Sequence, residues 1–362
     1  MQQTTIPVSA PIAIRSILRT QDLTPQFCDL VFQRADELEP YYLDRQARTR
    51  SAYRRLRDEM SEFIMVNLFS GESTRTRMSF SIAAKRLGIQ VESFTNFKVA
   101  SSYAKGESLE HTYMMSGVYL PDLIVIRDDD TAGAAELMSR LHPKVPIINA
   151  GDGSEQHPTQ AMLNLRLIKS RVGKLGHQKV VVVGDTRYGR AAKSDIYMMA
   201  KFPSMHIIIV SPQELRIPQQ LREYLEEPKV TDIGVTYEET DQLHDALKVA
   251  DIVSVSRIQK NLFEKDPETG KLTAEAQARY ERTSGQFSIG LKEMGLLKDQ
   301  AFVIHPLPID SHHPEIAPEV SNPFNPHPKC LVWQQVWSGL AMRGALAEYC
   351  LGGEWWNHAQ LS

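Results

Sequence analysis

Cysteine is scarce in this chain, which has only Cys28, Cys330 and Cys350 among its 362 residues. An odd number of cysteines without paired spacing argues against a disulfide framework or a zinc site and is typical of a reducing compartment. The sequence also lacks an apolar run of about 18 residues, the length that a membrane-spanning helix needs. Its N-terminus does not show the basic region and apolar core of a secretory signal. We therefore expect a soluble, cytoplasmic protein.

An excess of charge of either sign is also absent. Lysine and arginine number 41 against 44 aspartates and glutamates, which gives a net charge of −3. This balance provides no general attraction to nucleic acid or to an anionic membrane, so we expect neither as a partner, and any positive site has to be local. With 42% hydrophobic residues, the chain is long enough for two domains that each have a core.

Strand-like and helix-like segments alternate along most of the chain, a pattern that predicts βαβ units and parallel sheets. A new alternating series begins near residue 179, which predicts a second sheet. We expect an α/β protein with two doubly wound parallel-sheet domains and an active site in the cleft between them. The strand-like segments are 63–69, 90–94, 122–127, 145–150, 179–185, 205–211, 235–239, 251–256 and 301–304.

Two segments near the C-terminus stand outside this alternation. Residues 313–330 are rich in proline, which predicts a surface loop, because repeated prolines exclude regular structure. Residues 334–353 have the pattern of an amphipathic helix. His312, His313 and His327 could form a metal site, but their spacing matches no known ligand pattern and a solvated loop is the simpler interpretation.

The segment Ser-Thr-Arg-Thr-Arg at 73–77 follows an apolar strand and opens a predicted helix. The unpaired backbone N–H groups and the dipole at a helix N-terminus favour an anion, and a phosphate is the natural candidate. The alternative is an ordinary Ser or Thr N-cap with solvated arginines, which needs a single hydroxyl and no arginine.

Polar residues follow many of the predicted strands, where ligands bind in open parallel sheets. An arginine there can be an ordinary ion-paired side chain, and a histidine at 157 can be structural. Residues 184–189 could form a nucleotide-binding turn, but they lack the full glycine fingerprint. Several arginines in one cleft would repel one another unless a multiply charged anion binds among them. The strand-end residues are Arg127, 151–160, Arg187, Arg190, Arg257, Gln259 and 305–308.

Taken together and in this order, STRTR, Arg127, HPTQ, GDTRYGR, SRIQK and HPLP make the chain resemble the aspartate/ornithine carbamoyltransferase family, and within it the aspartate transcarbamoylase catalytic chains. The resemblance implies a carbamoyl-phosphate domain, an amino-acid domain and a C-terminal helix that returns to the first. It places the first domain at 1–157 plus 338–362 and the second at 158–337. It also implies transfer of a carbamoyl group from carbamoyl phosphate to L-aspartate in pyrimidine synthesis, with no metal or cofactor.

The same resemblance assigns residues to the two halves of carbamoyl phosphate. The phosphate would be held by Ser73, Thr74, Arg75 and Thr76. The carbonyl oxygen would face Arg127, Thr76 and His157, and a donor aimed at such an oxygen is worth about 10²–10³ in rate. The carbamoyl NH₂ would donate to Gln160 and to the main-chain carbonyl of Leu307.

For the second substrate, the resemblance implies that Arg190 and Arg257 bind the two carboxylates of aspartate, with Gln259 beside the amino group. Two arginines suit a dicarboxylate, because each guanidinium can donate two parallel hydrogen bonds to one carboxylate. Ornithine enzymes resemble the chain in STRTR and HPTQ but carry HCLP and a Ser-Met-Gly motif, so aspartate is favoured. Ser101 and Lys105 would complete the site of a neighbouring subunit, where Lys105 would also contact aspartate and act in catalysis. This implies a homotrimer.

Several positions depart from the family pattern. Gly71 stands where many relatives have a glutamate that bridges the domains, with Glu72 shifted by one. Leu262 and Ile309 stand where arginines are usual. A transcarbamoylase for another acceptor and a catalytically silent relative therefore stay open as alternatives. The sequence also leaves open a regulatory chain or a dihydroorotase-like partner.

Overall fold

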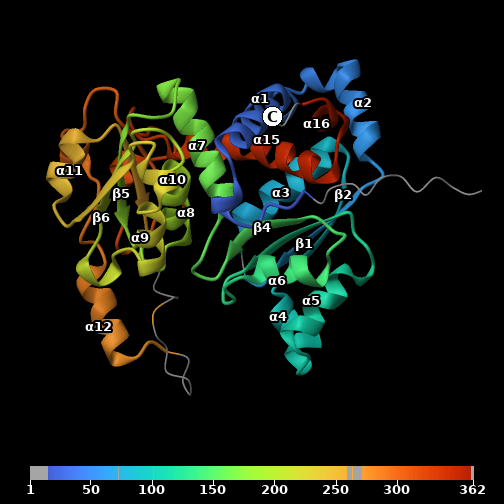
Figure 1. The fold of residues 1–362 in the computed structure, drawn as a ribbon, viewed down its shortest axis with the longest axis horizontal. Helices are drawn as coiled ribbons and strands as arrows, with labels where there is room; N and C mark the ends of the chain where they lie inside the picture. The colour runs from blue at the N-terminus through green and yellow to red at the C-terminus, as the bar shows by residue number, and fades with distance from the viewer. Residues whose placement is uncertain (1–14, 72, 101, 259–262, 264–270, 360–362) are drawn as a thin grey trace, which may run out of the picture.

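Two parallel β-sheets form the framework of the protein in the computed structural model, which describes residues 15–71, 73–100, 102–258, 263 and 271–359 (Figure 1). The first sheet has the order β2-β1-β3-β4 and the second β7-β6-β5-β8-β9. Every pairing within them is parallel. The predicted α/β fold with two parallel sheets is therefore confirmed. The strands are β1 Ile64–Phe69, β2 Gln90–Thr95, β3 Leu123–Asp128, β4 Ile147–Asp152, β5 Lys179–Gly184, β6 His206–Val210, β7 Thr236–Thr240, β8 Ile252–Ser256 and β9 Phe302–Ile304.

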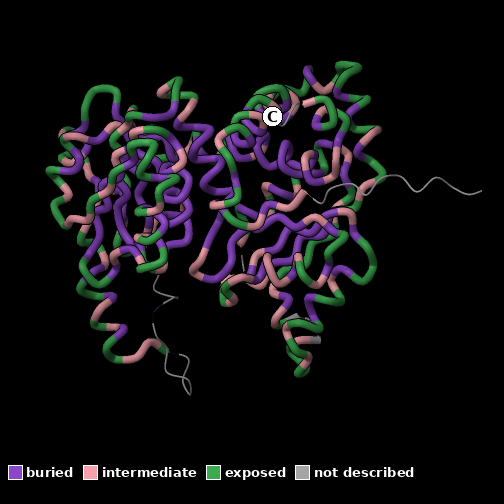
Figure 2. Tube along the Cα trace, viewed as in Figure 1, coloured by how far each residue is buried: buried purple, intermediate pink, exposed green. Residues whose placement is uncertain are grey.

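Strand β5 shows why its sheet needs helices on both faces. Successive side chains of a strand point to opposite faces, so a run of valines presents apolar groups to both. Val180 and Val182 belong to one buried cluster, and Val181 and Val183 belong to another. Both faces of the strand are thus covered, and Figure 2 shows buried chain through the centre of each lobe with exposed segments at the rims.

The first sheet has helices on both faces, as Figure 1 shows. One face carries α1, α2, α3, α15 and α16, whose apolar residues share a single core with the sheet. The other face carries α4, α5 and α6, which form a separate core with Val66, Ile124 and Ile126. The bounds are α1 Pro25–Leu43, α2 Ser51–Met60, α3 Thr74–Leu87, α4 Phe97–Ala100, α5 Leu109–Val118, α6 Ala134–Leu141, α15 Val332–Leu351 and α16 Glu354–His358.

The second sheet is covered in the same way, and α7 leads into it from the first sheet. Helices α8, α9 and α10 pack on one face, and α11, α13 and α14 contribute to the core on the other. Helix α12 packs in a small separate cluster with Phe263. The bounds are α7 Pro158–Val172, α8 Arg190–Met199, α9 Gln219–Leu225, α10 Pro228–Thr231, α11 Leu243–Val249, α12 Ala274–Thr283, α13 Leu291–Met294 and α14 Pro318–Ser321.

The predicted C-terminal helix is present as α15, but its predicted amphipathic character is wrong. It returns to the first sheet and contacts α1, α3 and α7 together, so most of its circumference is buried. Small residues permit this close approach. A Cβ at Gly344, for example, would overlap the hydroxyl of Tyr42.

The proline-rich segment 313–330 is not wholly irregular, which corrects the expectation of a loop. It contains the short helix α14, with Pro318 at its first position, where the missing N–H has no helical partner to lose. Ile316 and Val320 are buried against the second sheet. In the described part of the chain, no helix combines the length and the apolar character needed to cross a membrane.

Candidate active site

A cavity of about 340 Å³ opens where the carboxyl ends of strands from both sheets meet. Of the predicted residues, those from the first half of the chain that line it are Ser73, Thr74, Arg75, Thr76, Arg127, His157 and Gln160. From the second half, Arg190, Arg257 and Leu307 line it. Segments far apart in sequence thus converge on one space. Ligands of open parallel sheets bind at this position, beyond the carboxyl ends of the strands.

Helix α3 presents its N-terminus to this cavity. Ser73 is the N-cap residue, yet its side chain makes no capping hydrogen bond. Thr76 is buried in the first turn of the helix, and Arg75 is exposed at the rim. An ordinary N-cap would have used the Ser73 hydroxyl for the helix itself. The hydroxyl and the backbone N–H groups of the first turn are instead suited to an external anion.

His157 lies just before α7 and is buried in the cavity wall. Its backbone N–H donates to the hydroxyl of Ser194 at 2.9 Å, which ties the loop to α8. Burial, together with the charges of Arg127 and Arg190, holds the pKa of His157 well below its ordinary value. The imidazole is therefore neutral at pH 7 and can donate a single hydrogen bond to a ligand.

Gln160 is oriented by a buried chain of hydrogen bonds. The carboxylate of Asp195 accepts from the amide nitrogen of Asn164 at 2.9 Å, so the Asn164 oxygen faces the other way. That oxygen accepts from the amide nitrogens of Gln160 at 3.0 Å and of Gln335 at 2.5 Å. Because the nitrogen of Gln160 is engaged in this way, its oxygen is the atom suited to accept from a ligand NH₂.

Positive charge is concentrated around the cavity. Its lining includes Arg75, Arg127, Arg190, Arg257 and Arg343. Desolvation and the charge of Arg257 lower the pKa of Arg75, and burial together with Arg190 lowers that of Arg127. Burial is the larger cause of both shifts, and repulsion between neighbouring arginines adds to it. An anion with more than one charge would relieve this repulsion.

Sequence reasoning missed two charged residues of the site. Among the described residues that line the cavity, Asp129 is the single acidic one. The run of three aspartates after Arg127 was visible in the sequence, but nothing distinguished the second of them. Arg343 is a buried arginine on α15, and the helical pattern gave no reason to single it out. Conversely, Arg187 does not line the cavity, because its exposed side chain lies over the ring of Tyr188.

Lys105 is not brought into the cavity of its own chain. It ends the short helix η3, Ser102–Lys105, and its side chain is exposed. Four residues named from the sequence, Ser101, Gln259, Glu72 and Leu262, lie outside the described residues. No group of three potential ligand side chains that could hold a metal ion occurs among the described residues, which include His312, His313 and His327.

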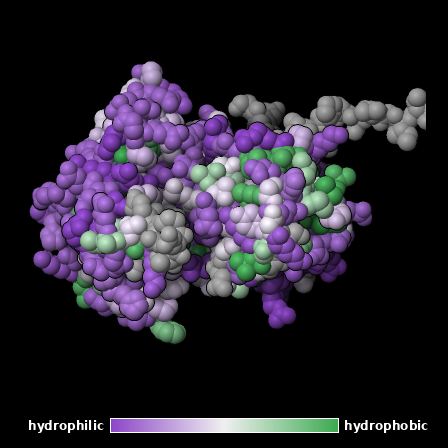
Figure 3. Space-filling model, turned by 90° about the horizontal axis from the view of Figure 1, so that it is seen from below, coloured by the Kyte–Doolittle hydropathy of each residue, from purple (hydrophilic) through white to green (hydrophobic). Residues whose placement is uncertain are grey.

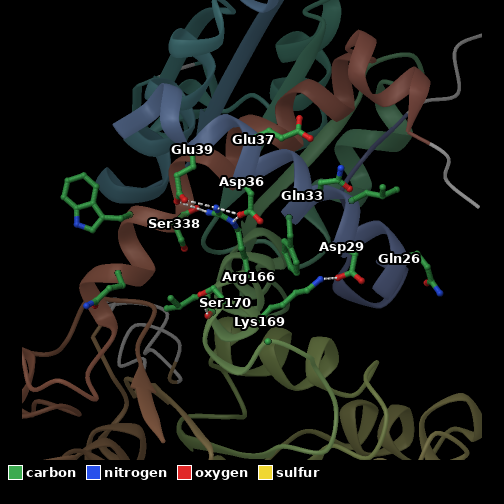
Figure 4. A pocket seen from close by; sticks show the side chains of 16 residues that line it. Gln26, Asp29, Gln33, Asp36, Glu37, Glu39, Arg166, Lys169, Ser170 and Ser338 are labelled. Atoms are coloured by element: carbon green, nitrogen blue, oxygen red, sulfur yellow. Dashed lines mark hydrogen bonds and ion pairs between the residues drawn. The ribbon is translucent and has the colours of Figure 1, made fainter. Parts of the chain in front are cut away.

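A larger pocket, of about 1180 Å³, lies away from these residues, where α1, α7 and α15 meet. Its charges are already paired. Figure 4 shows Arg166 pointing to Asp36 and Glu39, with the Arg166 to Asp36 distance at 2.6 Å, and Lys169 pointing to Asp29. These pairs tie α1 to α7 and leave no excess cation for an anionic ligand. The smaller cavity is therefore the candidate site.

Sequence models of one family match nearly the whole chain. The carbamoyl-P binding domain of aspartate/ornithine carbamoyltransferase matches residues 15–170, and the Asp/Orn binding domain matches residues 177–350. An aspartate carbamoyltransferase catalytic subunit from Methanopyrus kandleri is 35% identical and covers 94% of this chain and 98% of its own. A chloroplastic aspartate carbamoyltransferase from Oryza sativa subsp. japonica is 32% identical over 96% of this chain and 87% of its own.

Solved structures agree with the sequence comparisons. The aspartate transcarbamoylase of Trypanosoma cruzi, crystallised with carbamoyl phosphate and aspartate, superposes with a TM-score of 0.76 at 26% identity over 92% of this chain and 95% of its own. The aspartate transcarbamoylase catalytic subunit of M. jannaschii has a TM-score of 0.74 at 31% identity over 94% and 98%. This chain therefore belongs to the aspartate/ornithine carbamoyltransferase family.

Proposed function

We propose that the protein transfers the carbamoyl group of carbamoyl phosphate to the α-amino group of L-aspartate. The products are N-carbamoyl-L-aspartate and phosphate, an early step of pyrimidine synthesis. Residues 1–157 with 338–362 would form the carbamoyl-phosphate domain, and residues 158–337 the aspartate domain. The observation that carries this proposal is the convergence of five arginines, a helix N-terminus and an oriented Gln160 on one cavity.

Carbamoyl phosphate is bound through both of its ends in this proposal. The first turn of α3 and Arg75 hold the phosphate by backbone N–H groups and charge-assisted hydrogen bonds. Gln160 accepts from the carbamoyl NH₂, with the main-chain carbonyl of Leu307 as the second acceptor. Leu307 has a positive φ of 57° and its N–H donates to Nδ1 of His305 at 2.9 Å. Such a conformation is uncommon outside glycine and is often found at functional sites.

The reaction needs no covalent enzyme intermediate. The neutral amine of aspartate attacks the carbonyl carbon, and negative charge develops on the carbonyl oxygen, which Arg127, Thr76 and His157 of the cavity lining would stabilise. Collapse of the tetrahedral intermediate breaks the bond to the phosphate oxygen, and the departing phosphate accepts the amine proton. The protein contributes positioning and electrostatic stabilisation, which in other enzymes account for most of the rate enhancement.

The amino-acid side of the cavity supports a dicarboxylate. Arg257 directly follows β8, and Arg190 begins α8, the helix after β5; β5 and β8 are neighbours in the second sheet. The two arginines would bind the two carboxylates, with Gln259 beside the amine. A silent relative would have no use for arginines without a ligand, because crowded cations destabilise a fold.

The direct test is turnover with different acceptors. Phosphate release and ureido product are measured from carbamoyl phosphate with L-aspartate, with L-ornithine and with no acceptor. We expect turnover with aspartate alone. Binding of carbamoyl phosphate without turnover on either amino acid would point to another acceptor, and no binding would favour a silent relative.

We also propose a homotrimer in which Ser101 and Lys105 serve a neighbouring site. The lobe of the first sheet exposes large apolar side chains, and Figure 3 shows hydrophobic residues gathered on that lobe while the other is mainly hydrophilic. Val99, Tyr119 and Leu120 are 77%, 82% and 75% exposed, respectively. Exposed apolar surface of this kind supports the proposal that this lobe forms an interface. The segment before Lys105 is anchored by Lys98, which donates to Asp128 at 2.7 Å.

The shared site can be tested by mixing two inactive variants. Arg75→Ala and Lys105→Ala chains each lack one half of the site, so a mixed trimer contains some sites with neither change. We expect activity to reappear on co-assembly and to be absent from either parent. Failure to recover activity in mixed trimers verified by mass would exclude a shared site.

Because Cys28, Cys330 and Cys350 are free and buried, we further propose a cytoplasmic location.

A further inference from the structure

Asp129 joins an arginine from each domain through one carboxylate oxygen. It follows β3 in the first sheet, and its Oδ1 accepts from Nε of Arg127 at 2.9 Å. The same oxygen accepts from Nη2 of Arg190, the first residue of α8 beside the second sheet, at 2.5 Å. An ion pair therefore crosses between the domains at the wall of the cavity.

Arg190 is held mainly by groups of the first domain, although it belongs to a helix of the second. Its Nη1 donates to the carbonyl oxygen of Gly153 at 2.9 Å. Gly151 leaves room for the guanidinium, because a Cβ there would lie 3.1 Å from Cζ of Arg190. The Arg190 side chain is only 9% exposed. Separation of the two domains would remove these partners and change the orientation of the guanidinium.

The carboxylate of Asp129 fills the space beside Gly71. A Cβ at position 71 would lie 2.6 Å from Oδ2 of Asp129, closer than such atoms approach. The backbone N–H of Asp129 donates to the hydroxyl of Ser70 at 2.9 Å, which fixes the two segments together. The family resemblance implies a glutamate at position 71; here Gly71 has no side chain, and a carboxylate reaches the space beside it from the end of β3.

The electrostatics agree with a bridge that stays ionised. Burial alone would raise the pKa of Asp129, but the charges and hydrogen bonds of Arg127 and Arg190 hold it below its ordinary value. The carboxylate therefore offsets part of the positive charge of the cavity.

We propose that Asp129 is a positioning residue that holds Arg190 toward the amino-acid substrate and links the two domains. This inference rests on the proposed function, in which Arg190 binds a carboxylate of aspartate. Asp129 itself does not contact the reacting atoms.

The kinetic test compares Asp129→Asn with Asp130→Asn. Asp130 is the adjacent acid, its side chain is 75% exposed, and its contact with Lys98 is 3.5 Å long, so it is a matched control. We expect Asp129→Asn to raise the KM for aspartate at least tenfold with a smaller change in carbamoyl phosphate affinity, and Asp130→Asn to leave both unchanged. A lower KM for aspartate in Asp129→Asn would overturn the proposal, because Asp129 would then be competing with substrate for the arginines.

Moving the carboxylate from position 129 to position 71 tests whether aspartate binding depends on a negative charge in this space or on the Asp129 side chain itself. Gly71→Glu alone should impair aspartate binding, because two carboxylates would crowd one space. Asp129→Ala alone should impair it by removing the bridge. The double variant Asp129→Ala/Gly71→Glu should recover affinity relative to either single variant. Additive losses would overturn the inference.

A readout independent of activity distinguishes failure of this inference from failure of the proposed function. Asp129→Ala and Arg190→Ala should each lower the urea midpoint of unfolding. The double variant should lower it by less than the sum of the two single changes, since the pair between Asp129 and Arg190 is already lost in each single variant. Additive midpoint shifts would show that the pair does not interact, whether or not the protein turns over aspartate.

Discussion

Gln160 donates its side-chain amide to Oδ1 of Asn164 at 3.0 Å, and this bond decides which atom of Gln160 a ligand meets. The buried acid Asp195 sets this orientation, because the side-chain nitrogen of Asn164 donates to its carboxylate and leaves the Asn164 oxygen facing Gln160. A polar network inside the protein thus extends from the second sheet to the cavity wall.

Asn164→Leu should weaken carbamoyl phosphate binding about five- to tenfold, the effect of losing one well-oriented hydrogen bond. Acetyl phosphate has a methyl group in place of the NH₂ and should bind the variant as well as it binds the native protein. Both ligands can be measured as competitors at equilibrium. Equal weakening of the two would mean that Asn164 supports the fold of the site and not the orientation of Gln160.

Arg75→Ala should reduce turnover by a factor of about 100 or more, because the phosphate loses its charged partner at the helix N-terminus. Arg77 lies two residues further on the same helix and is not part of the cavity lining, so Arg77→Ala is the matched control. Circular dichroism should show native helix content in both. Near-normal turnover in Arg75→Ala would remove Arg75 from the phosphate site.

Arg257→Ala should chiefly affect the amino acid. Loss of a hydrogen-bonded charge pair predicts a KM for aspartate that is higher by about 10- to 100-fold, with little change in carbamoyl phosphate affinity. Steady-state kinetics at saturating carbamoyl phosphate gives this value. An unchanged response to aspartate would exclude Arg257 from the site.

Arg343 is a buried cation for which no ion pair is found among the described residues, and burial lowers its pKa to about 10. Its Nε has no hydrogen-bond partner within the described part of the chain. Arg343→Met keeps the length of the side chain and its contact with Phe80, so it should raise the free energy of unfolding by about 1 kcal/mol or more. The same change should reduce the stabilisation that added phosphate gives in thermal unfolding. A less stable variant would show that Arg343 is already compensated in the free protein.

Asp195 should give the protein a characteristic dependence on pH. Burial raises the pKa of this carboxyl from 3.8 to about 7, although Ser254 and Asn164 donate to it. Between these values the folded protein holds a proton that the unfolded chain has lost, so the contribution of Asp195 to stability falls as pH rises.

The substitution Asp195→Asn removes this titration. The free energy of unfolding of the variant, relative to the native protein, should therefore increase as pH rises from about 4 to about 7, the range between the two pKa values. Urea unfolding of both proteins across this range isolates the effect, since the other titrating groups contribute equally to the two free energies of unfolding. A difference that stays constant with pH would show that Asp195 has an ordinary pKa.

The sequence by itself determined the parallel sheets and most of the cavity. Apolar strands that alternate with helices permit few topologies, and the carboxyl ends of parallel strands meet at one edge of a sheet. The positions of Arg127, His157, Arg190 and Arg257 could therefore be predicted to lie together from their place after strands. The Ser-Thr-Arg-Thr-Arg segment could likewise be placed at a helix N-terminus from local pattern alone.

Tertiary structure decided the features that depend on contacts between distant segments. Helix α15 has a helical pattern, but the burial of most of its residues results from three helices packing around it. Asp129 and Arg343 look like ordinary charged residues in the sequence. Only folding places Asp129 beside Gly71 and Arg190, and Arg343 at the wall of the cavity, because side chains far apart in sequence interact through positions that local propensity does not encode.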